Sequence, residues 1–327
     1  MHETLNTTSV GSFPKPERLL EARRQRRQGR ISEEDLQAEE RLATVDVIRL
    51  QEDLGLDILV HGEMERGDMV AYFAERWTGF EESLPVRSYG NRYYRKPIVV
   101  GPVGPAPELL GVGAYRAAQA LTDRPVKGML TGPYTCCDWS FNAHYADRRA
   151  LVLDLAAIIH EEAKALDEAG CQYIQIDEPA LSTRPDELPL AIEAMEIVTA
   201  GIRARTISHI CYGDFDKIYP DLLQLPVRQL DLEAQNRGFE LLDLLARHPW
   251  PADKELALGV VDVHRHRIET VEEVERGILQ ALQIVPPELL YIDPDCGMKT
   301  RTWEEARQKL TVMMEAVARV REAVGLL

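Results

Sequence analysis

Short apolar runs alternate along the chain with longer stretches in which apolar residues recur at helical spacing. The short runs predict buried β-strands, and the longer stretches predict amphipathic helices. Eight runs are interpreted as strands, namely TTSVGSF, LDILVHGE, VKGMLTGP, YIQIDEPA, TISHICYG, QLDLEAQ, ELALGVVDVH and LLYIDPDCG. Helical stretches lie between most of these strands. Two of these helical stretches are the longest. One extends from about Glu33 to Leu54, where Gly55 is expected to end the helix, and the other from about Thr302 to Val324.

Strands that alternate with helices predict a parallel sheet with helical crossovers. Eight strands in 327 residues favour a single (β/α)8 TIM-type barrel over an open doubly wound sheet. One catalytic domain is therefore expected over residues 1–327. The segment RYYRKPIVVGPV departs from the alternation and predicts a hairpin inserted between the second and third strands.

Polar residues collect where the predicted strands end. They are Ser12, Glu63, Asp177, His209, Cys211, Glu233, His264 and Cys296. A TIM barrel carries its active site on the face formed by the carboxyl ends of its strands. The sequence therefore predicts an enzyme whose site is built from these side chains.

Four of these residues are of the types that bind zinc. His209 and Cys211 are two apart on one extended segment, so both side chains project to the same side. Glu233 and Cys296 follow later strands. Two thiolates, an imidazole and an exchangeable carboxylate make a tetrahedral Zn²⁺ site that can ionise a substrate thiol. An isolated H-x-C pair is more often a buried histidine beside an inert cysteine, but the strand-end placement favours zinc.

The remaining polar residues suit an amino-acid substrate. Asp177 and Glu178 are adjacent on a strand, so only one can face the barrel mouth, and we expect Asp177 to bind an ammonium group. Glu63 is a second candidate for that group, and an exposed loop acid is its alternative interpretation. Ser12 can hold a carboxylate through its hydroxyl and the neighbouring amides.

His264 is the candidate general acid, because an ordinary pKa of about 6.5 suits proton transfer near neutral pH. Asp262 lies two residues earlier and is expected to orient it, whereas His266 is a rival for the same role. Trp139 offers a stacking surface for a flat ligand, although a core tryptophan gives the same sequence signal.

Composition limits the cellular locations and the classes of binding partner that are expected. A net charge of −16 disfavours nucleic acid and anionic membranes as partners. No apolar run reaches the roughly 18 residues of a membrane span. Five widely spaced cysteines favour reduced thiols and a cytoplasmic location. The basic run from Arg23 to Arg30 is expected to be a solvated helix face, with a docking patch for an acidic partner as the alternative.

The chain resembles the catalytic C-terminal domain of cobalamin-independent methionine synthase over nearly its whole length. The matching segments, in the family's order, are TTSVGSFPKP, LVHGEMER, SYGNRYYRKPIVVG, LTDRPVKGMLTGP, WSF, QIDEPAL, HICYGDF, GVVDVH and PDCGMKTR. The resemblance implies a TIM-type barrel whose zinc binds homocysteine as a thiolate and whose product is methionine.

The resemblance also implies a role for individual residues. The family's zinc ligands fall on His209, Cys211, Glu233 and Cys296. Its homocysteine contacts fall on Val10, Ser12, Glu63 and Asp177, and its proton donor falls on His264. Its methyl-donor contacts fall on Arg92 and Trp139.

Two departures from the family bear on the methyl donor. Full-length members carry an additional N-terminal barrel that helps to hold the polyglutamate tail of methyltetrahydrofolate, and this chain is expected to be a short type without it. Tyr93 and Thr183 stand where a cysteine and a glutamate are expected in the folate site. We therefore expect a methylated corrinoid as donor, either methylcobalamin or a corrinoid protein. Methyltetrahydrofolate is the alternative, and His264 supports it because leaving from a folate nitrogen needs an acid.

Two other functions compete with methionine synthesis. A related zinc alkyltransferase acting on the thiol of coenzyme M shares the H-x-C pair and the late cysteine. Coenzyme M has no ammonium group, however, so Glu63 and Asp177 favour homocysteine. A protein that only binds methionine or zinc is the second alternative, and His264 argues against it.

Overall fold

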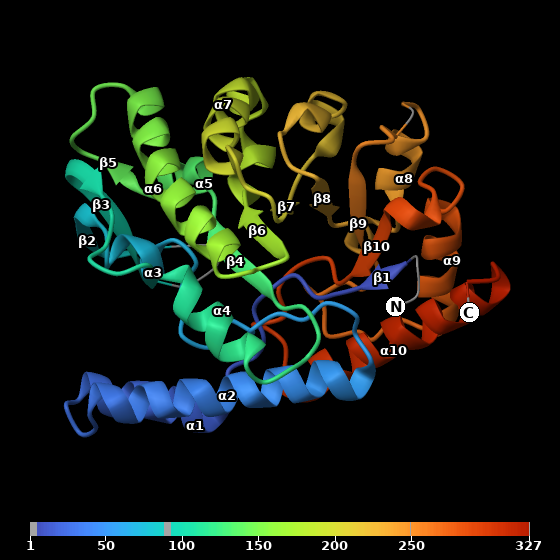
Figure 1. The fold of residues 1–327 in the computed structure, drawn as a ribbon, viewed down its shortest axis with the longest axis horizontal. Coiled ribbons are helices and arrows are strands. Elements are labelled where there is room, and N and C mark those ends of the chain that lie inside the picture. Colours follow the sequence, from blue (N-terminus) through green and yellow to red (C-terminus); the bar gives the residue numbers. More distant parts are fainter. Residues whose placement is uncertain (1–4, 88–92, 249, 327) are drawn as a thin grey trace. The chain divides into compact units, whose positions relative to one another are not determined.

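The computed structural model describes residues 5–87, 93–248 and 250–326. The chain divides into two compact units, and each unit is made of separate stretches of sequence. The first comprises Met1–Glu65, Ala114–Lys127 and Arg228–Leu327, and the second comprises Arg66–Gly113 and Gly128–Val227. Figure 1 labels the elements of both units.

Short parallel strands form the sheet of the first unit. In spatial order they are β1 (Asn6–Thr7), β10 (Leu290–Asp293), β9 (Glu255–Gly259) and β8 (Gln229–Leu232). Every residue of β8, β9 and β10 is buried. Strands that are buried on both faces are apolar along their whole length, which explains why these segments appear in the sequence as continuous apolar runs.

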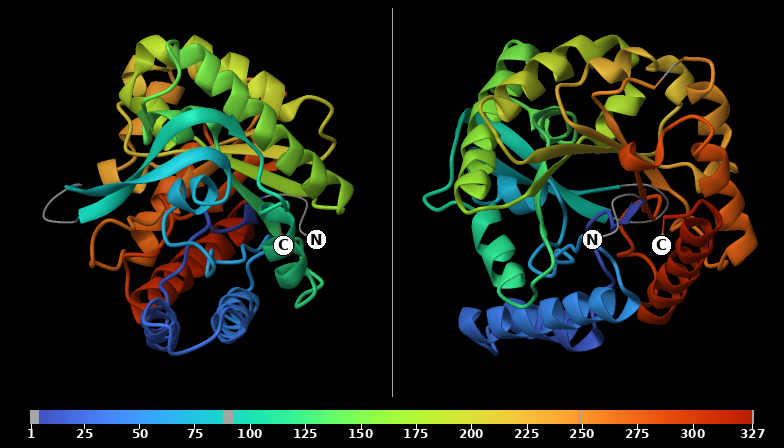
Figure 2. Two further views of the ribbon diagram at one scale, coloured as in Figure 1. Left: turned by 90° about the vertical axis from the view of Figure 1, so that its left-hand side faces the viewer. Right: turned by 45° about the vertical axis from the view of Figure 1, so that its right-hand side comes forward.

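The helices of the first unit are α1 (Glu17–Arg27), α2 (Glu33–Leu54), α8 (Glu240–Leu245), α9 (Val271–Ala281), α10 (Trp303–Ala323) and most of α4 (Gly111–Gln119). Helices α1 and α2 form a helical hairpin, and α9 packs beside α10 (Figures 1 and 2). Capping boxes begin α2, α9 and α10 at Ser32, Thr270 and Thr302, where each side chain accepts a backbone N–H that the helix leaves unpaired. Gly55 ends α2 with a φ of 87°, as predicted.

The basic run of α1 is neutralised by nearby glutamates. Arg24 forms ion pairs with Glu17 and Glu21, each at 2.7 Å, and Arg26 pairs with Glu33 at 2.8 Å. These side chains are largely exposed, so the pairs are worth little individually. Arg24 and Arg26 agree with a solvated helix face, but Arg23 does not, because its side chain is only 20% exposed and its Nη2 donates to Met64 O at 2.6 Å.

The parallel strands of the second unit are β4 (Lys127–Thr131, whose first residue belongs to the first unit), β6 (Tyr173–Asp177) and β7 (Arg205–Ile210). Its helices are α3 (Ala71–Ala74), α5 (Pro133–Asp138), α6 (Arg148–Glu168) and α7 (Leu188–Thr199). Helix α6 packs along α7 (Figure 1). Short 3-10 helices of the two units are η1 (Pro179–Thr183), η2 (Pro185–Glu187), η3 (Phe215–Lys217), η4 (Asp221–Gln224), η5 (Gln235–Arg237) and η6 (Pro287–Leu289).

A hairpin is inserted as predicted, but RYYRKPIVVGPV supplies only its second strand instead of the whole hairpin, and the first strand comes from the preceding segment. Strand β2 (Thr78–Arg87) pairs antiparallel with β3 (Tyr93–Gly104), and β5 (Phe141–Asn142) adds a short parallel strand to β3. Figure 2 shows the long twisted ribbon that β2 and β3 form. Residues 88–92, which include Arg92, lie outside the described residues.

Parallel pairing joins β1, β10, β9 and β8 in the first unit and β6 and β7 in the second. The first predicted strand, TTSVGSF, overlaps β1 only at Thr7, because the chain leaves the strand there. The second predicted strand, LDILVHGE, forms only one bridge, between Leu59 and Val126. On one side of this segment Leu59 N–H donates to Pro125 O at 2.8 Å, and on the other Ile58 N–H donates to Thr7 O at 3.0 Å. The segment therefore takes the place of an eighth strand next to β1 and β4.

A turn explains why this strand is so short. Gly62 has a φ of 80° and Glu63 a φ of 55°, and a chain with positive φ cannot continue a β-ladder. The apolar pattern of LDILV is real, since Leu59 and Val60 are fully buried, but the pairing stops before the polar end of the motif.

Two composition-based expectations can be compared with the structure. No helix within the described residues is long and apolar enough to cross a membrane. All five cysteines lie within the described residues, and none of them forms a disulfide. A cytoplasmic location stays a prediction.

Candidate active site

Glu233, His264 and Cys296 lie in the loops that follow β8, β9 and β10 in the first unit. The Nε2 atom of His264 lies 3.4 Å from Oε2 of Glu233. The Glu233 side chain is only 2% exposed, and its Oε1 has no hydrogen-bond partner among the described residues. A buried carboxylate oxygen without a partner is costly, so a cation fits this position.

The loop after β9 fixes His264 through Asp262. Asp262 Oδ1 accepts the backbone N–H of His264 at 2.7 Å, so it orients the turn rather than the imidazole ring. Burial alone would lower the pKa of His264. The hydrogen bond with Glu233 and the negative charges of Cys296, Glu233 and Asp262 outweigh burial, and the pKa is raised. A raised pKa keeps a larger fraction of the imidazole protonated, which suits a proton donor.

The four predicted zinc ligands are divided between the two units. His209 lies in β7 and Cys211 follows that strand directly, and both are buried in the second unit. Glu233 and Cys296 follow β8 and β10 in the first unit. An imidazole nitrogen, two thiolates and a carboxylate are donors that zinc prefers.

The predicted carboxylate-binding segment lies directly against the loop of Cys296. Val10 and Ser12 are buried. The Met298 N–H donates to Ser12 O at 2.7 Å. A Cβ atom on Gly297 would lie 2.2 Å from Oγ of Ser12, so this close approach requires glycine at position 297.

Glu63, the predicted ammonium ligand, has a left-handed backbone held by its neighbours. The Phe13 N–H donates to Gly62 O at 3.1 Å, which ties the Glu63 turn to the segment that carries Ser12. The Glu63 N–H donates to Nδ1 of His61 at 3.1 Å, and Nζ of Lys15 donates to Glu63 O at 3.2 Å. A non-glycine residue at a φ of 55° stores strain, and such strain gathers at functional sites.

Lys15→Met is expected to raise the KM for homocysteine about tenfold with little change in kcat. The reason is that a hydrogen bond from a charged donor is worth about 1.5 kcal/mol or more, and the Glu63 turn would lose one. The measurement is steady-state kinetics, with Met substituted for the exposed Lys164 as a control. An unchanged KM would remove Lys15 from the site.

The Lys15→Met variant should also differ from the native protein in how its free energy of unfolding changes with pH. Burial, with repulsion from Arg23 and Lys299, lowers the pKa of Lys15 to about 8, against 10.5 in the unfolded chain. The unfolded chain therefore binds more protons at Lys15 between these values, so Lys15 contributes a gain in stability as pH rises from 8 to 10.5. Urea unfolding across that window should show a smaller gain in Lys15→Met than in the native protein, because the variant keeps the lowered pKa values of Lys96 and Lys254.

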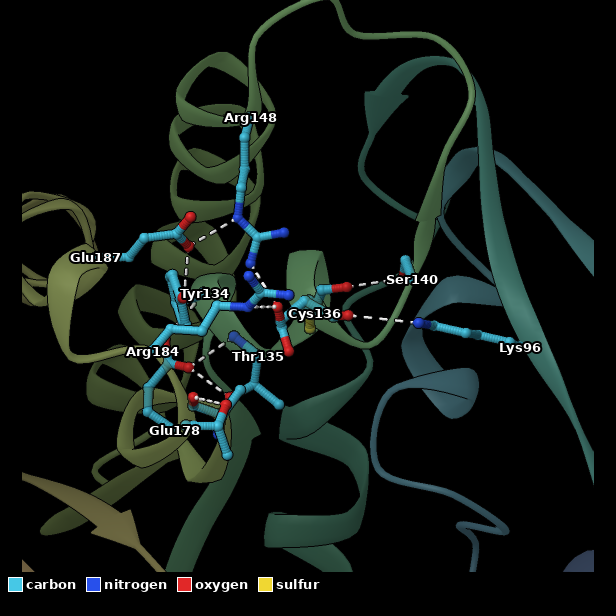
Figure 3. Close-up of polar contacts among 12 residues, drawn as sticks. Lys96, Tyr134, Thr135, Cys136, Ser140, Arg148, Glu178, Arg184 and Glu187 are labelled. Atoms are coloured by element: carbon cyan, nitrogen blue, oxygen red, sulfur yellow. Dashed lines mark hydrogen bonds and ion pairs between the residues drawn. The ribbon is translucent and has the colours of Figure 1, made fainter. Parts of the chain in front are cut away.

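Asp177 and Glu178 have different hydrogen-bond partners, as the alternation of side-chain directions along an extended chain predicts. Asp177 ends the strand and its Oδ1 accepts Nε2 of Gln175 at 2.7 Å. Glu178 is fully buried and accepts the N–H groups of Tyr134 and Thr135 at 3.0 and 2.7 Å and the Thr135 hydroxyl at 2.6 Å (Figure 3). Burial raises the pKa of Glu178 to about 7 although these bonds oppose it.

Trp139, the predicted stacking residue, follows the last residue of α5 and is half-buried. Glu178 binds the first turn of this helix. At the other end Asp138 Oδ1 accepts Nη2 of Arg148 at 2.6 Å and Nε of Arg184 at 2.7 Å (Figure 3). The polar network therefore fixes both ends of α5 and with them the position of Trp139.

Sequence reasoning missed two groups, the half-buried Lys15 and the fully buried Asp295. Lys15 gave no signal, because a lysine after a proline usually lies in solvent. Asp295 precedes Cys296 directly in the motif PDCG and accepts three backbone N–H groups. The position of this acid beside a predicted ligand was the available signal.

The sequence was compared with known families. A family model described as "Cobalamin-independent synthase, Catalytic domain" matches residues 5–319. The chain belongs to this family. The resemblance drawn from the sequence motifs is thereby confirmed, and so is the expectation of a methyltransferase enzyme of the cobalamin-independent methionine synthase family.

Individual members of the family are similar over most of their length. A methionine synthase of Saccharolobus solfataricus is 40% identical over 319 residues, which cover 97% of this chain and 95% of the relative. One of Sulfurisphaera tokodaii is 41% identical over 97% of this chain and 93% of the relative.

Solved structures of known proteins share the fold. A B12-independent methionine synthase from Shewanella sp. W3-18-1, in complex with selenomethionine, has a TM-score of 0.87 and 27% identity, over 99% of this chain and all of that chain. This match confirms the predicted TIM-barrel-like α/β fold. A methyltransferase from Methanosarcina mazei, with a TM-score of 0.63 and 15% identity over 98% of this chain and 94% of that chain, shares the fold alone.

Proposed function

We propose that the chain transfers a methyl group to the sulfur of homocysteine at a zinc centre and thereby forms methionine. The observation that carries the proposal lies in the first unit: the Glu233 carboxylate is buried, its Oε1 has no hydrogen-bond partner among the described residues, and its Oε2 lies 3.4 Å from Nε2 of His264. The proposed catalytic domain is the whole chain, 1–327, and its proposed location is the cytoplasm, where thiol ligands stay reduced.

The donor set fits zinc. His209, Cys211 and Cys296 supply one nitrogen and two sulfurs, and Glu233 offers a buried oxygen without a partner among the described residues. A bound Zn²⁺ would lower the pKa of the substrate thiol and stabilise its thiolate, which is the nucleophile. The Oε2 of Glu233 is directed to His264, so Oε1 is the atom available to a metal.

The chain's own residues recognise the amino-acid part of the substrate. We assign the carboxylate of homocysteine to Val10 and Ser12, which offer a hydroxyl and backbone amides. We assign its ammonium group to the carboxylates of Glu63 and Asp177. Charged groups buried with the substrate strengthen this recognition, and a thiol that lacks an ammonium group would leave both acids unpaired.

The methyl donor is proposed to be methyltetrahydrofolate. The corrinoid donor expected from the sequence, and with it a corrinoid protein as partner, has no support in the comparisons. The family is described as cobalamin-independent, and the solved relative is described as B12-independent. His264 fits a folate donor, because the nitrogen that loses the methyl group must gain a proton. Trp139 and Arg92 are the proposed donor contacts.

A methylated corrinoid is the second candidate donor because of one local contact. The Thr183 hydroxyl donates to Ala180 O at 2.8 Å, so this position offers the donor no carboxylate. A folate ring with hydrogen-bond donors would lack that acceptor, whereas a methyl group leaving cobalt requires neither acceptor nor acid.

The test is methionine formation by the zinc-loaded protein from homocysteine, with methyltetrahydrofolate and methylcobalamin assayed side by side. We expect methionine from methyltetrahydrofolate. Activity with methylcobalamin alone would replace the folate donor by a corrinoid, and activity with neither would contradict the proposed reaction.

Thermal protection distinguishes homocysteine from coenzyme M. A ligand that binds the native state raises the unfolding temperature, so homocysteine should stabilise the zinc-loaded protein and coenzyme M should not. Protection by coenzyme M alone would assign the chain to the alkyltransferases that use that thiol.

A further inference from the structure

Asp295 bonds to the loop after β8 although the two are far apart in sequence. The side chain is fully buried. Its Oδ1 accepts the N–H groups of Ala234 and Gln235, both at 2.9 Å, and its Oδ2 accepts the N–H of Asn236 at 2.7 Å. Three successive backbone N–H groups thus converge on one carboxylate, an arrangement that fixes the conformation of a loop.

The two segments joined in this way carry proposed zinc ligands at the adjacent positions. Glu233 directly precedes Ala234, and Cys296 directly follows Asp295. We propose that Asp295 is a positioning residue of the metal centre, whose carboxylate sets the separation between Glu233 and Cys296. The inference rests on the proposed zinc function and goes beyond it, since Asp295 is not itself a ligand.

The neighbouring strand leaves room for this carboxylate. A Cβ atom on Gly259, the last residue of β9, would lie 2.4 Å from Oδ1 of Asp295 and 2.7 Å from its Cα. The Asp295 N–H donates to Val261 O at 3.0 Å, which fixes the acid's own backbone. The backbone of Asp295 is therefore fixed by Val261, and its side chain reaches across β9 to the loop that carries Glu233.

A loop-capping acid with no effect on the metal is the competing explanation. The two explanations differ in what happens to the metal site when the carboxylate changes but the fold survives. Groups that orient metal ligands typically change metal affinity about 10- to 100-fold when they are mutated. A residue that only caps the loop would change the stability of the fold and leave the zinc affinity unchanged.

The substitution Asp295→Asn, made in the full chain, distinguishes the positioning role from simple loop capping. Its Oδ1 can still accept two N–H groups, but its amide nitrogen would meet the N–H of Asn236, donor against donor. We expect zinc binding, measured by competition with a chelator, to weaken about 10- to 100-fold. We also expect the visible spectrum of the Co²⁺-loaded variant to change, because that spectrum reports ligand geometry.

A matched control and a second variant complete the experiment. Asp167→Asn is the control, since Asp167 accepts the N–H of Ala204 at 2.8 Å before β7, away from the strand end where the ligands lie. Gly259→Ala keeps the carboxylate but displaces it, and it should weaken zinc binding in the same direction. It also serves as the test if Asp295→Asn does not fold.

The results are decisive in either direction. Weaker zinc binding and an altered Co²⁺ spectrum in a folded variant, with Asp167→Asn unchanged, would support the positioning role. Native zinc affinity and a native Co²⁺ spectrum in folded Asp295→Asn and Gly259→Ala would overturn it and leave the proposed function intact. If the native protein itself bound no zinc, the proposed function would fail first and this inference with it.

Discussion

Cys296→Ser is expected to abolish stoichiometric zinc binding and methyl transfer together. A serine hydroxyl stays protonated where a thiolate would bind, so the proposed set of zinc ligands loses a charged donor. The metal content is measured in the purified protein, and methionine formation is measured after zinc loading. Both should fall to the background of the assay.

Cys171→Ser is the matched control for this substitution. Cys171 is buried and forms no disulfide, and its Sγ donates to Tyr173 O at 3.1 Å, a bond that a serine hydroxyl can also make. Its zinc content and activity should remain those of the native protein. Full zinc content in Cys296→Ser would refute the assignment of Cys296 as a ligand.

His264→Asn is expected to lower kcat with methyltetrahydrofolate by about 100- to 10,000-fold, the usual contribution of a general acid. Zinc should stay bound at full stoichiometry in the zinc-loaded variant and homocysteine affinity should change little, because His264 is not one of the proposed ligands, although losing its hydrogen bond to Glu233 can lower zinc affinity. With methylcobalamin as donor the same variant should keep much of any native activity, since cobalt leaves without a proton. Kinetics with both donors and a metal assay check these outcomes.

His266→Asn tests whether the effect is specific to position 264. The His266 side chain is 77% exposed and its Nδ1 lies 2.7 Å from Glu305, at the first turn of α10. We expect native kcat in this variant. A large loss of kcat at position 266, with a normal rate for His264→Asn, would transfer the role of proton donor to the rival histidine.

The placement of the candidate ligands at strand ends could be predicted from the sequence, because the topology of a barrel determines where the ends of its strands lie. Parallel strands bring their carboxyl ends to one face, so residues as distant as His209 and Cys296 can be expected to meet once their strands are identified. The types of the side chains then indicate the chemistry. No knowledge of exact geometry was needed for this step.

Features that depend on close contact could not be predicted. The role of Asp295 requires three backbone N–H groups from a loop about 60 residues away, and sequence shows only an acid. The lowered pKa of Lys15 requires its partial burial, which a lysine between two prolines does not suggest. The shortened strand at Leu59 follows from the positive φ of Gly62 and Glu63, whereas an apolar pattern alone predicts a full strand.

The single bridge at Leu59 also shows which element holds the segment before Glu63. Val60 is paired by the buried side chain of Gln51 in α2 instead of by a neighbouring strand: Oε1 of Gln51 accepts the Val60 N–H at 3.0 Å, and its Nε2 donates to Val60 O at 2.9 Å. The position of the Glu63 turn is therefore linked to a helix as well as to the sheet.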